Sequence, residues 1–213
     1  GVLGIHIEGP FFNPARRGAH AADMIRAIDA ADLATLATPT GGRTLVTLAP
    51  EMVDAAHIRQ LADAGIVVAA GHTEADVATI ATARKAGLSG FTHLFNAMPP
   101  FAGRAPGPVG AALADGDAWA SLIVDLQHVS ATSLCVALAA KGWQRCVLIT
   151  DAMTTPDAVG DGFTLTGQAV SLKDGCLVTA EGRLAGSLLD MATAVRNTVN
   201  VLGLPLEAAL QMA

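Results

Sequence analysis

The 213-residue sequence has few charged residues, no tyrosine and no long apolar run. Charged residues make up 15% and hydrophobic residues 52% of the chain, a composition that excludes an intrinsically disordered protein. The net charge is −6 and lysines and arginines form no cluster, which argues against a nucleic-acid-binding surface. Polar residues such as Asp125, His128 and Lys141 interrupt every stretch that approaches 18 apolar residues, so the sequence predicts no membrane helix.

Cysteine is also scarce. Cys135, Cys146 and Cys176 have neither an even count nor the spacing of a metal site, which is typical of reduced thiols in a cytoplasmic protein. Because the sequence opens directly on a strand pattern, we expect no signal peptide. The sequence opens on Gly1 and stops within a helical pattern at Ala213, so we expect it to be part of a longer polypeptide.

Short Val/Ile/Leu runs alternate with helical patterns along most of the chain. Strands are predicted over residues 2–9, 44–49, 66–71, 90–94, 120–125 and 145–150. Helices are predicted near 21–37, 54–64, 75–86, 130–141 and 188–202, with a final helix after Pro205. Continuous apolar strands separated by helices indicate a parallel sheet covered on both faces.

This alternation favours the α/β class and, within it, a (β/α)8 barrel of the metal-dependent hydrolase type. Six of the eight strands are visible, and we expect the other two to lie on the N-terminal side. An open doubly wound sheet also fits the pattern. Residues 162–183 break the rhythm and predict an antiparallel hairpin with an Asp174-Gly175 turn. Residues 1–213 are thus interpreted as one partial catalytic barrel domain with a hairpin insertion.

Residues that can bind metal or transfer protons follow several of the predicted strands. In a barrel of parallel strands the carboxyl ends open on one face, so such residues converge. Glu8, His72 and His93 form a two-histidine, one-carboxylate set, the ligand types of catalytic zinc or ferrous iron. Taken singly, each of the two histidines is as often a hydrogen-bonded core residue as a metal ligand. For His6 we favour that structural role.

Four further polar residues are candidates. Asp151 ends an apolar strand and is either a helix cap or a general base and acid beside a metal site. His128 follows a strand and can orient a substrate carbonyl or hydroxyl. Arg104, in the Pro/Gly-rich loop 97–110, is a solvated side chain or a clamp for a phosphate. His20 is a loop residue with an open role, and His57 is expected at the surface.

Six segments, taken in order, resemble the N-acetylglucosamine-6-phosphate deacetylases of the amidohydrolase superfamily. They span residues 4–20, 46–51, 70–73, 92–98, 103–107 and 150–152. The resemblance covers nearly the whole chain, and Gly-Ile-His-Ile-Glu-Gly-Pro at the start of the first segment and Thr-His-Leu-Phe-Asn-Ala-Met at 92–98 are its most specific motifs.

The resemblance implies a barrel enzyme that converts N-acetyl-D-glucosamine 6-phosphate to glucosamine 6-phosphate and acetate in amino-sugar catabolism or recycling. It implies a cytoplasmic homodimer with one divalent metal ion, zinc or iron(II), per site and room for a second in the full-length protein. Glu8, His72 and His93 match metal ligands, and Asp151 matches the catalytic aspartate. Substrate-binding positions match Ala19, His20, Asn96, Ala97, Arg104, His128, Leu184, Ala185 and Gly186, with Arg104 neutralising the phosphate, in one alternative across the dimer interface.

The chain departs from the family pattern in three places. Leu126 stands where the family usually has glycine before the histidine, and Thr73 replaces a more usual serine. The strand that would carry a second metal-binding pair and the family's small β-sandwich are both absent. Two alternatives therefore remain: another amidohydrolase acting on a different acylated amino sugar or a cyclic amide, and an inactive sugar-phosphate-binding fragment.

Overall fold

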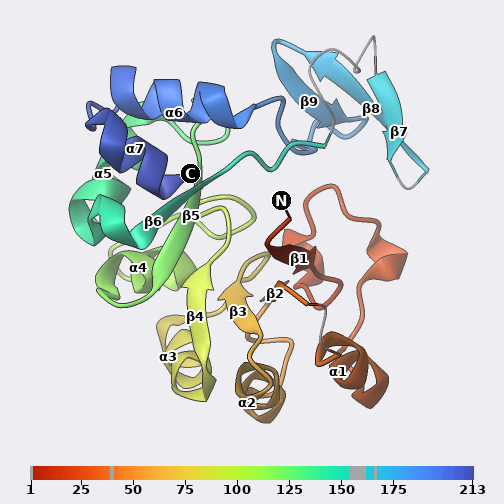
Figure 1. Cartoon of the computed structure of the whole chain (residues 1–213). Coiled ribbons are helices and arrows are strands. Elements are labelled where there is room, and N and C mark those ends of the chain that lie inside the picture. The colour runs from red at the N-terminus through yellow and green to blue at the C-terminus, as the bar shows by residue number, and fades with distance from the viewer. Residues whose placement is uncertain (1, 39–40, 154–161, 166) are drawn as a thin grey trace. The chain divides into compact units, whose positions relative to one another are not determined.

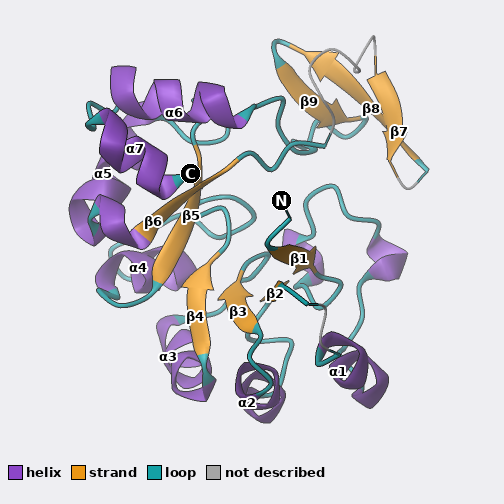
Figure 2. Cartoon of the chain, in the orientation of Figure 1, coloured by secondary structure: helices purple, strands orange, loops and turns teal. Residues whose placement is uncertain are grey.

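The computed structural model describes residues 2–38, 41–153, 162–165 and 167–213. These residues form two compact units, Gly1–Arg17 with Ala22–Trp119 and Gly18–Ala21 with Ala120–Ala213. Figure 1 and Figure 2 show the elements of both units and their order along the chain.

The first unit contains a parallel sheet. Its strands are β1 (Gly4–Glu8), β2 (Arg43–Leu48), β3 (Val67–Ala70) and β4 (Leu88–Phe91), and each pairs in parallel with the next. The strands β2, β3 and β4 are largely buried, as the continuous apolar runs predict. In β1, by contrast, the side chain of Ile5 remains 52% exposed.

Helices connect these strands. They are α1 (Ala30–Leu36), α2 (Ala55–Asp63), α3 (Val77–Ala86) and α4 (Gly107–Ala114), with the 3-10 turns η1 (Pro14–Arg16) and η2 (Ala22–Met24). Figure 1 shows α1, α2 and α3 following one another along one side of the sheet. The carboxylate of Asp76 caps α3 by accepting a hydrogen bond from the amide of Thr79, so the strand-to-helix turn has a local cause.

The second unit pairs β5 (Trp119–Ile123) in parallel with β6 (Cys146–Ile149) and contains α5 (Ala131–Lys141), η3 (Trp143–Arg145), α6 (Met191–Asn200) and α7 (Leu206–Met212). A separate antiparallel sheet follows, made of β7 (Gly162–Leu165), β8 (Gln168–Lys173) and β9 (Cys176–Thr179). Asp174 and Gly175, both with positive φ, form the turn between β8 and β9.

Two helix predictions need correction. The predicted helix at 21–37 is helical only at η2 and α1, because Asp29 forms a capping box with Asp32 and sets a new helix start. The loop predicted over 97–110 ends earlier than expected, because α4 already begins at Gly107. The proline in the first turn of α4 is tolerated there, since its missing amide hydrogen has no partner within a helix. No helix among the described residues is long and apolar enough to span a membrane.

Candidate active site

Three predicted metal ligands lie at the carboxyl ends of strands in the first unit. Glu8 is the last residue of β1, and His72 and His93 each follow their strand by two residues. The backbone of both histidines is left-handed, with φ of 50° at His72 and 34° at His93. Such a conformation is costly for a side chain other than glycine and is found preferentially at functional sites.

The three side chains converge on one point. Oε1 of Glu8 lies 2.8 Å from Nε2 of His93 and 3.1 Å from Nε2 of His72, and the two Nε2 atoms are 3.0 Å apart. Both histidines are buried, with exposed fractions of 6% for His72 and 3% for His93. The structure therefore brings together residues that are up to 85 positions apart in the sequence.

The chemistry of this cluster fits a cation. Nδ1 of His72 lies 2.7 Å from the carbonyl oxygen of Arg16, and only a protonated Nδ1 can donate there. In the neutral ring the Nε2 of His72 then carries a lone pair directed at the carboxylate of Glu8. A lone pair that faces a carboxylate needs a positive charge between them, which a divalent metal would supply.

The dimensions also fit. In a tetrahedral zinc site with bonds of about 2.0–2.1 Å, neighbouring ligand atoms lie about 3.3–3.4 Å apart. The three distances here, 2.8, 3.0 and 3.1 Å, need to widen by only a few tenths of an ångström. Burial by itself raises the pKa of Glu8, but in the metal-free protein hydrogen bonds from protonated rings of His72 and His93 would outweigh it and hold that pKa far below its usual range, the part that a metal ion would take over when bound. Glu8 therefore stays ionised, as a metal ligand must.

A buried aromatic ring supports His72 from one side. The Phe12 ring stacks on the His72 imidazole with centroids 4.1 Å apart and planes 21° apart. Gly9 has φ of 80°, and a Cβ there would lie 2.6 Å from the Phe12 ring. Glycine at this position thus allows both the turn after Glu8 and the packing of Phe12.

A hydrogen-bonded chain joins His6, Thr47 and Thr92, and it adjoins the cluster because Thr47 pairs with Glu8 in the sheet and Thr92 precedes His93. Nε2 of His6 lies 2.7 Å from Oγ1 of Thr47, which lies 2.6 Å from Oγ1 of Thr92. His6 is exposed as a whole residue, but the burial of its imidazole lowers the pKa of that ring. The contacts agree with the hydrogen-bonded role favoured for His6 from the sequence.

The loop after β4 holds three predicted substrate residues. Nδ2 of Asn96 donates to the carbonyl of His93 at 3.3 Å, and Ala97 is left-handed with φ of 50°. The carbonyl of Ala97 accepts the amide hydrogen of Thr73 at 3.2 Å. Arg104 is exposed. The structure thus ties Asn96 and Ala97 to the histidine segments and leaves the phosphate role of Arg104 as a prediction.

The predicted catalytic residues Asp151 and His128 belong to the second unit. Asp151 lies two residues beyond the end of β6 and has a left-handed φ of 50°. Its backbone carbonyl accepts a hydrogen bond from the amide of Ser187 at 2.8 Å. Nδ1 of His128 lies 2.6 Å from the carboxylate of Asp125, whose other oxygen accepts two amide hydrogens. Although burial raises the pKa of Asp125, these hydrogen bonds lower it overall. Asp125 therefore fixes the His128 ring, a partner that the sequence prediction did not assign.

The remaining predicted substrate residues also lie in the second unit. Ala19 packs against the buried cluster of Val170, Leu177 and Ala185, and the half-buried His20 adjoins it in sequence. Leu184 is 38% exposed. Gly186 has φ of 76°, and its backbone lies close to Asp151, since a Cβ built on Gly186 would lie 2.9 Å from the Asp151 carbonyl oxygen. Their contacts with a substrate remain predictions.

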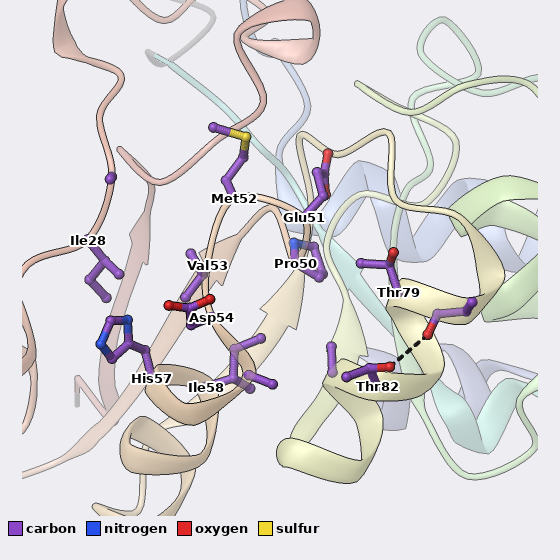
Figure 3. A pocket seen from close by; sticks show the side chains of 14 residues that line it. Ile28, Pro50, Glu51, Met52, Val53, Asp54, His57, Ile58, Thr79 and Thr82 are labelled. Carbon is purple, nitrogen blue, oxygen red and sulfur yellow. Dashed lines mark hydrogen bonds between the residues drawn. The ribbon is translucent and has the colours of Figure 1, made fainter.

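A separate hollow of about 590 Å³ lies in the first unit, between the residues before α1, the loop after β2, and the helices α2 and α3. Figure 3 shows its lining, which includes Glu51, Asp54 and His57 but none of the three predicted metal ligands. His57, expected at the surface of a helix, lies half-buried on α2, and its Nδ1 is buried without a hydrogen-bond partner in the described part of the chain.

Comparisons with known proteins find relatives over the entire chain. The sequence is 40% identical over 213 residues to the N-acetylgalactosamine-6-phosphate deacetylase of Shewanella sp. (strain ANA-3), covering 100% of this chain and 54% of that protein. It is 40% identical over 200 residues to the N-acetylglucosamine-6-phosphate deacetylase of Bacillus subtilis (strain 168), covering 92% of this chain and 50% of that protein. No family model matches.

Solved structures agree. The N-acetylglucosamine-6-phosphate deacetylase from Pasteurella multocida superposes with a TM-score of 0.91 at 34% identity, covering 100% of this chain and 56% of that one. A mutant of the Mycobacterium smegmatis enzyme in complex with N-acetyl-D-glucosamine-6-phosphate gives 0.86 at 36% identity, covering 98% of this chain and 56% of that one.

Over its whole length the chain is similar to N-acetylglucosamine-6-phosphate deacetylases.

The likeness to these solved structures confirms the α/β fold class and its partial barrel of the deacetylase type. The chain spans about half the length of the relatives it matches. The deacetylase family is metal-dependent, and Glu8, His72 and His93 provide a candidate site for that metal.

Proposed function

We propose that this chain carries the main part of the active site of a metal-dependent amide hydrolase. The reaction is removal of the acetyl group from N-acetyl-D-glucosamine 6-phosphate, which gives glucosamine 6-phosphate and acetate. The observation that supports it most is the convergence of Glu8, His72 and His93, within about 3 Å of one another, in a relative of these deacetylases.

Glu8, His72 and His93 would hold one divalent ion, zinc or iron(II), and the full-length protein would have room for a second. A bound divalent ion supplies Lewis-acid chemistry, polarising a carbonyl and lowering the pKa of a water. The protein's part begins with Asp151, which takes a proton from the attacking water and returns it to the amine nitrogen as the C–N bond breaks. The water oxygen ends in the acetate.

The other predicted residues bind and orient the substrate. His128, held by Asp125, donates from Nε2 to the acetamido carbonyl when its ring is protonated, or accepts a sugar hydroxyl when neutral. Arg104 is the cation for the 6-phosphate, and its binding energy positions the amide for attack. We propose Ala19, His20, Asn96, Ala97 and the segment Leu184–Gly186 as the remaining sugar contacts, in a cytoplasmic homodimer.

The identity of the sugar is the second question. The two N-acetylgalactosamine-6-phosphate deacetylases from Shewanella and Escherichia coli O157:H7 are each 40% identical to this chain, the same value as the N-acetylglucosamine-6-phosphate deacetylase from Bacillus subtilis. The galactosamine epimer is therefore a second candidate substrate. The two sugars differ only at the 4-hydroxyl, so a single polar contact can separate them.

Acetate release by the full-length protein tests the proposal. The substrates are the two epimeric 6-phosphates and unphosphorylated N-acetylglucosamine, and we expect turnover of a 6-phosphate and little turnover of the free sugar. Asp151→Asn should abolish turnover and leave the metal content intact. Undiminished activity in that variant, or equal rates with and without the phosphate, would contradict the assigned roles.

A further inference from the structure

Glu51 is a strand-end carboxylate for which the reaction proposed above has no use. It lies three residues beyond β2, and its side chain extends from the loop that also lines the hollow in Figure 3. Oε1 of Glu51 accepts hydrogen bonds from Nδ2 of Asn13 at 3.0 Å and from the amide of Glu74 at 2.6 Å. Oε2 accepts one from the hydroxyl of Thr73. One exposed carboxylate thus binds both the segment after β1 and the segment after β3.

These two segments enclose His72. The amide of Asn13 donates to the carbonyl of His72 at 3.0 Å, and the carbonyl of Arg16 accepts from Nδ1 of His72 at 2.7 Å. Asn13 and Arg16 are joined by the turn η1, which the Asn13 side chain caps. Thr73, next to His72, returns the connection to Glu51. The hydrogen bonds therefore form a closed ring that holds His72 at its carbonyl, its ring nitrogen and its following residue.

This ring of hydrogen bonds can hold the backbone of His72 in its left-handed conformation, which has φ of 50°. A strained conformation persists only when its surroundings hold it there. The contact with Arg16 also selects the imidazole tautomer of His72 that carries its proton on Nδ1. The lone pair of Nε2 then faces Glu8 and His93. Loss of Glu51 would release both segments at once.

We propose that Glu51 is a positioning residue for the metal site: through Asn13 and Thr73 it fixes the backbone and the tautomer of His72. It does not itself touch the metal or the substrate. This inference rests on the proposed function only in taking His72 as a metal ligand.

Metal affinity of the full-length protein tests the inference, measured with zinc against a chromophoric chelator. Glu51→Ala removes all three acceptor contacts and should weaken zinc binding by about 10–100-fold, the range for partners that orient a ligating histidine. Glu51→Gln keeps one acceptor oxygen and should fall between Glu51→Ala and the wild type. The matched control is Asp54→Ala, since Asp54 is an exposed carboxylate of the same loop whose side chain makes no capping hydrogen bond to α2.

A second readout does not depend on metal. In the metal-free protein, nitrogen NMR of the histidine rings should show His72 protonated on Nδ1 in the wild type and in Asp54→Ala, and a mixture of tautomers in Glu51→Ala. If Glu51→Ala does not fold, Thr73→Val removes one contact of the ring at nearly constant volume and should give the same direction in both readouts. Wild-type zinc affinity together with an unchanged His72 tautomer, in Glu51→Ala or in Thr73→Val, would overturn the inference. A wild-type protein that binds no zinc would instead refute the metal site, and the tautomer measurement would still decide the role of Glu51.

Discussion

Gly71 is a point where one added methyl group should damage the metal site. The residue is buried between β3 and His72, and a Cβ built on it would lie 2.6 Å from Cγ2 of Thr47 and 3.2 Å from Cβ of Thr92. Carbon atoms in contact are normally about 3.5–4.0 Å apart, so the overlap with Thr47 is about 1 Å. Gly71→Ala therefore forces either the threonines or His72 to move.

The threonines cannot move cheaply. Thr47 is 0% and Thr92 1% exposed, and their hydroxyls lie 2.6 Å apart in the chain that includes His6. Overpacking of such a site costs about 1–3 kcal/mol of folding free energy. Because His72 is the next residue, part of the displacement falls on its Nε2. We expect Gly71→Ala to lower the melting temperature of the metal-free protein and to weaken zinc binding by about tenfold or more.

The control places a similar overlap elsewhere. Gly87 precedes β4 at the end opposite to His93, has φ of 115°, and would bring a Cβ to 2.5 Å from Cβ of Ala62. Gly87→Ala should lower stability to a similar degree while zinc affinity stays at the wild-type level. The assay is a thermal unfolding curve and a zinc titration for both variants of the full-length protein. A folded Gly71→Ala protein with undiminished zinc affinity would refute this account of how His72 is held.

Three further predictions concern sites with clear local causes. Hydrogen bonds from Arg26 hold the pKa of Asp32 at about 2, below the unfolded value of 3.8, so the stabilisation is present above about pH 4 and lost as the pH falls toward 2. Denaturant curves should show Asp32→Asn less stable by about 1 kcal/mol near neutral pH, discounted for solvent screening, with a difference that shrinks on acidification; a pH-independent difference would exclude the ion pair as its cause. Burial raises the pKa of Cys146 to about 11 and the residue is 4% exposed, so a disulfide reagent should modify the exposed Cys135 and leave Cys146 unmodified in the native protein, which peptide mass mapping checks. Asp125→Asn should place an amide donor against Nδ1 of His128 and reduce acetate release by about 10–100-fold at constant metal content; full activity would show that the orientation of His128 does not limit the reaction.

The strands β2, β3 and β4 were predictable because each buries a continuous apolar run. The predicted strands 44–49 and 66–71 agree with the observed β2 and β3 to within one residue at each end. Strand polarity also groups Glu8, His72 and His93 from the sequence alone, since parallel strands end on one face. The turn at Asp174-Gly175 was readable for a local reason, the ease with which these residues adopt positive φ.

Other features depend on contacts that no local pattern encodes. The ring through Glu51, Asn13 and Thr73 joins three loops, and each member taken alone is an ordinary polar loop residue. The hollow lined by His57 likewise forms only where the residues before α1, the loop after β2 and the helices α2 and α3 come together. Tertiary packing, which sequence periodicity does not report, decides both.

The most direct test of the central claim is the metal content of the full-length protein. We predict that the wild type retains a tightly bound divalent metal after dialysis, that Glu8→Ala loses it, and that Asp54→Ala keeps it. Elemental analysis of the three purified proteins gives the answer without reference to any substrate. Equal metal content in the wild type and Glu8→Ala would contradict the assignment of Glu8, His72 and His93 as the metal site.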